Sequence, residues 1–99
     1  MKTGDESIER LPGGALVRQG LADLQAGRTT VAAYLASIAG PRLRRAGLLA
    51  DTCRLPEEPE LELYRLLRSE GGDAYSRYNS LLREVVSFEN ALDVKNLDV

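Results

Sequence analysis

The chain has 99 residues, of which 43% are hydrophobic, and it carries a formal net charge of −2 with one Cys and no His. This length fits one domain, and the composition is too apolar for an intrinsically disordered protein. Without His, imidazole bases, Ser-His or Cys-His nucleophile pairs and His metal ligands are excluded, and a single Cys excludes an intramolecular disulfide and a thiolate zinc site. We therefore expect no catalytic, metal-binding or cofactor-binding residues.

The polar start of the chain does not have the pattern of a signal or transit peptide. No window approaches the roughly 18 consecutive apolar residues that a membrane span needs. These features predict a cytoplasmic protein with no membrane association. In that reducing setting we interpret Cys53 as a small residue at a loop or helix end, with a redox or intermolecular role as the alternative.

The first two predicted helices cover residues 13–26 and 30–39. In the first, apolar residues recur at helical spacing, and Gly20 lies within their stripe, which predicts close approach of another helix at that glycine. Gly27 is a suitable C-terminal stop, and Thr29 is a suitable N-cap for the second helix. Gly40 and Pro41 end the second helix.

A short third helix is predicted over residues 41–49, with Leu43 facing inward and Arg42, Arg44 and Arg45 around the remainder. Residues 50–58 form the longest stretch without a pattern and are predicted to be a loop. We expect the third helix and this loop to form one exposed end of the molecule.

The fourth and fifth predicted helices cover residues 59–70 and 74–92. The apolar residues of the fourth helix occupy more than half of its circumference, which is typical of a central helix or of one that faces a second chain. Gly71 and Gly72 break the chain, and Asp73 caps the fifth helix, whose apolar stripe is about 160° wide at 100° per residue.

Together these segments predict an all-α fold, a compact bundle of four to five short helices in a single domain over residues 11–92. Residues 1–10 and 93–99 are predicted to be flexible ends. The near-zero net charge divides into opposed blocks, because Arg42, Arg44 and Arg45 precede the loop and four glutamates lie between residues 57 and 62, at the end of the loop and just after it.

Glu89 falls in the middle of the apolar stripe of the fifth helix, where an unpaired buried carboxylate would be very costly. Three explanations are open. The helix overhangs the domain and leaves Glu89 in water, an Arg of the same chain pairs with it, or the stripe is a subunit seam where Glu89 meets an Arg of a partner.

The wide stripes favour a non-enzymatic protein–protein interaction or regulatory module, which associates with itself as a homodimer or with a larger protein partner. The candidate contacts are Leu66, Leu67, Val86 and Phe88 at the stripe edges, together with Glu89 within the stripe. The alternative is a nucleic-acid-binding regulator with a degenerate helix-turn-helix around residues 32–49. Its candidate nucleic-acid or anion contacts are Arg42, Arg44, Arg45 and Arg77.

Overall fold

The all-α fold expected from the sequence is confirmed. The computed structural model describes residues 8–50 and 52–97, and within them five named helices and no strand are formed. The helices are α2 (Gly14–Gln25), α3 (Val31–Ile38), α4 (Gly40–Arg45), α5 (Pro59–Glu70) and α6 (Ala74–Leu97). Their starts lie within one residue of the predicted starts, because glycine, proline and capping residues mark each one.

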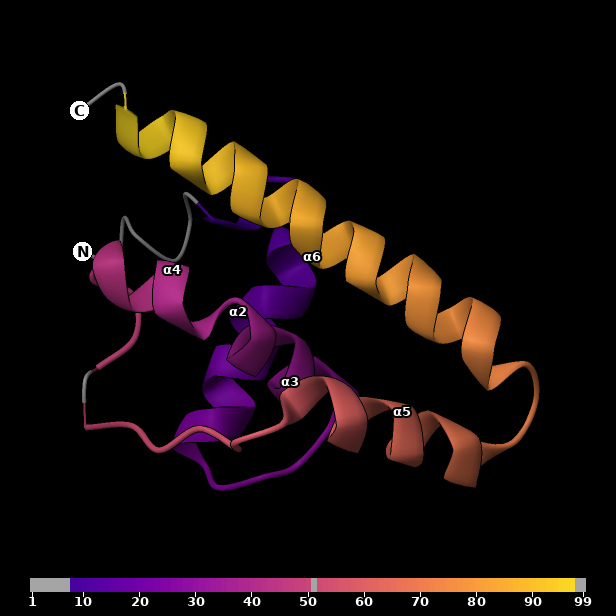
Figure 1. Cartoon of the computed structure of the whole chain (residues 1–99). Helices are drawn as coiled ribbons and strands as arrows, with labels where there is room; N and C mark the ends of the chain where they lie inside the picture. The colour runs from indigo at the N-terminus through magenta and orange to yellow at the C-terminus, as the bar shows by residue number, and fades with distance from the viewer. Residues whose placement is uncertain (1–7, 51, 98–99) are drawn as a thin grey trace.

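Helix α3 is the central element, since it contacts α2, α4, α5 and α6 (Figure 1). From its wide apolar surface, α5 was predicted to be either a central helix or one that faces a second chain. The structure favours α3 as the central helix because its alanines let neighbouring backbones approach closely. The predicted contact at Gly20 is confirmed, since a Cβ atom there would overlap the Ala32 carbonyl oxygen and lie 2.7 Å from Ala36 Cβ.

The turn between α2 and α3 is held by a buried carboxylate, Asp23, whose role the sequence pattern did not predict. Asp23 is 4% exposed, and its carboxylate accepts hydrogen bonds from Thr30 Oγ1 at 2.6 Å, Gln19 Nε2 at 3.0 Å and two guanidinium nitrogens of Arg28. Thr30 Oγ1 also accepts from the Ala33 amide at 3.1 Å. The N-cap of α3 is thus Thr30 and not Thr29, because Thr30 can serve the helix and Asp23 together.

Helix α6 lies across the other helices and forms an antiparallel hairpin with α5 (Figure 1). Gly71 and Gly72 have φ values of 83° and 75°, which favour glycine, and they allow the chain to reverse. The predicted cap is confirmed, since the Ser76 amide donates to Asp73 Oδ1 at 3.1 Å. Helix α6 is about 36 Å long and α5 about 18 Å, so the second half of α6 extends past α5 and over α4.

The two ends of the packed unit differ from the predicted bounds. Ile8 is 1% exposed and belongs to the core, although it falls in the segment expected to be flexible. At the other end α6 continues to Leu97, five residues beyond its predicted end, because Leu92 is buried and Asp93 is bonded to Arg42 of α4. Residues 1–7 and 98–99, for which flexibility was also predicted, lie outside the described residues.

Candidate functional site

The α5–α6 hairpin presents an apolar surface. One aromatic contact between the two helices shows which side of α6 faces α5 and so locates this surface. The rings of Tyr64 on α5 and Tyr78 on α6 meet edge to face, with centroids 5.3 Å apart and an interplanar angle of 80°. Tyr78 therefore marks the side of α6 that faces α5. The core side of α6 carries Val85, which is 3% exposed, and Phe88, which is fully buried.

Continuing around α6 from the core side past Tyr78, the next side chains face outward. Tyr75, Leu82 and Val86 lie roughly 40–80° beyond Tyr78 at 100° per residue. Tyr75 is 67% exposed, Val86 is 52% exposed and Leu82 is half-buried. On α5, Leu61 is 43% exposed. We call this surface the hairpin face and define it by Leu61, Tyr64, Tyr75, Tyr78, Leu82 and Val86.

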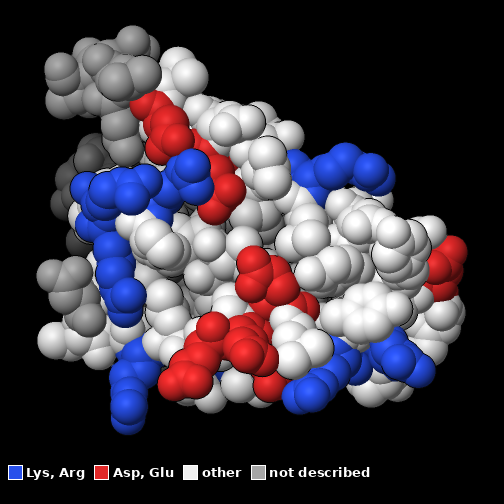
Figure 2. Space-filling model, viewed as in Figure 1, with Lys and Arg blue, Asp and Glu red and all other residues white. Residues whose placement is uncertain are grey.

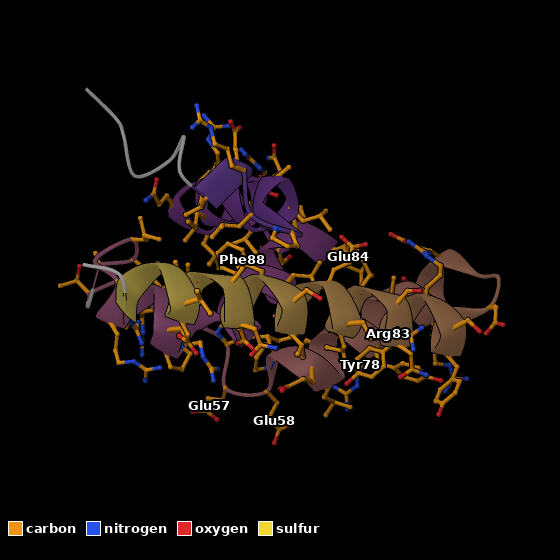
Figure 3. The ribbon with its side chains drawn as sticks, turned by 90° about the horizontal axis from the view of Figure 1, so that it is seen from above. Glu57, Glu58, Tyr78, Arg83, Glu84 and Phe88 are labelled. Atoms are coloured by element: carbon orange, nitrogen blue, oxygen red, sulfur yellow. The ribbon has the colours of Figure 1, made fainter. Side chains whose placement is uncertain are left out.

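Charged side chains border the hairpin face with opposite signs at its two ends. Figure 2 shows acidic side chains gathered where the chain enters α5 and basic side chains farther along α5, with uncharged surface above them. Glu57, Glu58 and Glu60 are the exposed acidic residues of that first segment, and Arg65 and Arg68 are exposed near the far end of the helix. In Figure 3, Glu57 and Glu58 project away from the fold on the side of α6 where Tyr78 lies, whereas Phe88 and Glu84 lie on the other side.

Beside the acidic end, Glu89 is paired within the chain. Its carboxylate lies 3.4 Å from the Arg42 guanidinium and its side chain is 14% exposed. Burial raises the pKa of Glu89, and the charge of Arg42 partly offsets this effect. Of the three explanations left open by the sequence, the structure shows the second, since an arginine of the same chain meets the carboxylate.

Arg42 itself is held by two carboxylates. Its Nε donates to Asp93 Oδ2 at 3.0 Å, and this hydrogen bond, with the charge of Glu89, raises the pKa of the guanidinium. Arg44 donates to the Cys53 carbonyl and so anchors the loop after α4. Two of the four arginines proposed as nucleic-acid or anion contacts are therefore engaged inside the molecule, because α6 and the loop pack beside α4.

The other two arginines of that set lie on separate elements. Arg45 is exposed on α4 and forms no ion pair within the described residues. Arg77 lies at the start of α6, where its Nη1 is 3.0 Å from Glu70 Oε1 across the glycine turn. The four arginines do not converge on one site.

The predicted helix-turn-helix also differs from what is formed. Helices α3 and α4 are joined by Ala39 alone, and α4 has only 6 residues. A DNA-binding helix-turn-helix has a turn of roughly three to four residues and a recognition helix that reaches the major groove. Here Leu43 is fully buried, which fixes α4 against the core.

The residues proposed as partner contacts divide between core and surface. Leu67 and Phe88 are fully buried in the core, so their side chains are not available to a partner, and their assignment to an interface is corrected. Glu89 is engaged with Arg42. Leu66 is half-buried and Val86 is exposed, and only Val86 belongs to the hairpin face.

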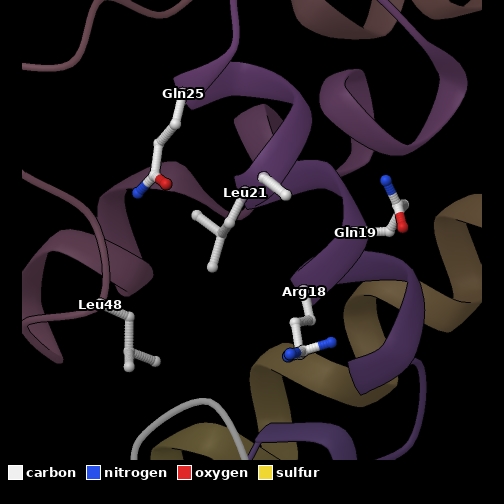
Figure 4. A pocket seen from close by; sticks show the side chains of 6 residues that line it. Arg18, Gln19, Leu21, Gln25 and Leu48 are labelled. Carbon is white, nitrogen blue, oxygen red and sulfur yellow. The ribbon is translucent and has the colours of Figure 1, made fainter. Parts of the chain in front are cut away.

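Elsewhere on the surface the hollows are small or shallow. A pocket of about 170 Å³ lies between α2 and Leu48 (Figure 4), and its only charged lining residue is Arg18. A more open hollow of about 460 Å³ between α6 and the starts of α2 and α3 is lined by Leu16, Val31, Ser76, Arg77, Ser80 and Leu81. Among the described residues, no group of three or more acidic or Cys side chains is placed to hold a metal ion.

Over the described part of the chain, none of the helices combines the length and the apolar character needed to cross a bilayer. Comparisons with known protein families, with curated proteins and with solved structures found no match for this chain.

Proposed function

We propose that this protein is a protein–protein interaction module that binds its partner through the hairpin face. One observation carries the proposal: all four large hydrophobic residues exposed in the described part of the chain lie on α5 or α6. Three of them, Leu61, Tyr75 and Val86, belong to the hairpin face, and the fourth is Val94 farther along α6.

Scattered exposed apolar residues are normal, but a group of them on one face marks a site of association. Tyrosine side chains suit such a site, because they bury a large ring and keep a hydroxyl for the polar rim. The two helices also stand antiparallel and side by side, so a partner helix can lie along them with its apolar residues at helical spacing.

The test compares two adjacent substitutions on α6. Val86→Glu places a charge on the hairpin face, and Ser87→Glu places the same charge roughly 100° around the helix, outside that face. Both side chains are exposed, so neither variant is expected to unfold. Tagged wild type and both variants are expressed in the cells from which the sequence comes, beside a second copy with a different tag.

The proposal is supported when a chain retained by the wild type and by Ser87→Glu but lost from Val86→Glu is identified, as the second copy or as another protein, and shows the same difference in affinity once purified. The affinity is measured by titration calorimetry. Retention of the same chains by all three would contradict the role of the hairpin face.

A further inference from the structure

The charges around the hairpin face favour one arrangement of two copies. The end of the face where α5 begins is acidic, with Glu57, Glu58 and Glu60 exposed, and none of them is ion-paired within the described residues. Farther along α5 the exposed charges beside the face are basic, and at the turn beyond them the acidic Glu70 is paired with Arg77 at 3.0 Å. Arg68 is exposed and forms no ion pair within the described residues, and Arg65 is exposed and lies 3.5 Å from Glu62.

A two-fold axis that lies in the plane of the interface, perpendicular to the helices, places the acidic end of one copy on the basic end of the other. A two-fold axis parallel to the helices would instead bring like ends together, which is repulsive. The antiparallel arrangement also superimposes the apolar middles of both copies, so that four helices enclose one apolar layer in the manner of an antiparallel bundle.

We propose, as a deepening that rests on the proposed function, that the occupant of the hairpin face is a second copy of this chain in antiparallel two-fold arrangement. Leu61, Tyr75 and Val86 of both copies form the apolar contact along the length of the helices. Glu57 and Glu58 of each copy face Arg65 and Arg68 of the other at the two rims.

Sedimentation equilibrium and light scattering over low to high micromolar concentrations measure the association. The wild type is expected to form dimers, and Val86→Glu is expected to weaken them by roughly tenfold or more, because it buries an unpaired charge. Ser87→Glu is the matched control and is expected to retain the dimer. Circular dichroism confirms that both variants remain helical.

Charge exchange tests the orientation. The double variants Glu57→Arg with Glu58→Arg, and Arg65→Glu with Arg68→Glu, are each expected to dimerise more weakly than the wild type, because each has the same sign of net charge at both ends. An equimolar mixture of the two is expected to restore association as a heterodimer. Arg45→Glu makes a charge reversal on α4, away from the face, and is expected to leave the dimer unchanged.

The effect of salt on dimer affinity distinguishes the antiparallel from the parallel orientation. Added salt screens the opposed rims and is expected to weaken the antiparallel dimer, whereas it would strengthen a parallel one. Strengthening by salt, or a wild type that stays monomeric at high micromolar concentration, would overturn the inference. A monomer that still binds another chain in a manner abolished by Val86→Glu would overturn only the second-copy assignment and leave the proposed function intact.

Discussion

Arg42 on α4 reaches across to Glu89 on α6, with their charged atoms 3.4 Å apart, and the same arginine donates to Asp93 one turn farther along the helix at 3.0 Å. This contact ties the part of α6 that extends past α5 to the body of the molecule. Glu89 is the more buried partner, so the interaction is asymmetric: removing the arginine leaves a carboxylate in a place where burial already raises its pKa.

Arg42→Met is therefore expected to destabilise the fold at pH 7, whereas Arg42→Met with Glu89→Met is expected to recover most of the loss, because an apolar pair of similar size carries no desolvation cost. The pKa of Glu89 rises further in the single variant, since the cation that lowered it is gone. Protonation then relieves the buried charge, so the deficit relative to wild type narrows as pH falls from 7 toward 5. Urea unfolding at several pH values measures the difference in the free energy of unfolding between Arg42→Met and the wild type. A deficit that grows in acid would contradict this account.

The Asp23 carboxylate has the opposite pH dependence. Hydrogen bonds from Thr30 and Arg28 hold its pKa below the usual value, so its contribution to stability is fully present above the unfolded-state pKa of about 3.9 and is lost as pH falls through the lower folded-state pKa. Asp23→Asn is expected to lower the melting temperature by roughly 5 °C or more at pH 6. The difference in melting temperature between Asp23→Asn and the wild type is expected to shrink below pH 4. Gln25→Asn, an exposed change on the same helix, is the control and is expected to show neither effect.

The sign of the stability change caused by Gly20→Ala tests the close contact between α2 and α3. In an exposed helix this change stabilises by about 1 kcal/mol, because alanine has the higher helix propensity. Here the added methyl group would overlap the Ala32 carbonyl, so the expected result is a loss of roughly 1–3 kcal/mol. Ser80→Ala on the exposed side of α6 is the control, expected within about 0.5 kcal/mol of wild type. Stabilisation by Gly20→Ala would mean that α2 and α3 are not in such close contact.

Substitutions at Leu67 and Val86 distinguish an effect on folding stability from an effect on association. Leu67→Ala opens a cavity in the core and is expected to cost about 2–5 kcal/mol in the free energy of unfolding. Val86→Ser removes an exposed side chain and is expected to change that free energy by no more than about 0.5 kcal/mol while weakening association. Denaturant unfolding measures the first quantity and sedimentation the second. Equal destabilisation by both would place Val86 in the core.

The local sequence was sufficient to predict the helices and the residues at which they begin. Gly71, Gly72 and Asp73 mark the reversal and the start of α6, and Pro59 marks the start of α5, because each acts on the backbone within one turn. The same holds for Gly20, where a glycine inside an apolar stripe indicated a neighbouring helix. A polar network such as that of Asp23 left a weaker signal, an acid in the last turn of a helix with an arginine and a threonine just beyond it.

Only the tertiary structure decided which edge of each apolar stripe is buried. The width of the stripes on α5 and α6 indicated more apolar surface than one small domain needs, but Leu67 and Phe88 proved to be core residues, whereas Tyr75 and Val86 are exposed. That division depends on how α6 is rotated against α5, which the Tyr64–Tyr78 contact sets. The pairing of Arg42 with Glu89 joins residues far apart in the chain, and no local pattern encodes it. Composition and periodicity thus determined the elements, and the packing of α6 over α3, α4 and α5 determined which residues face solvent.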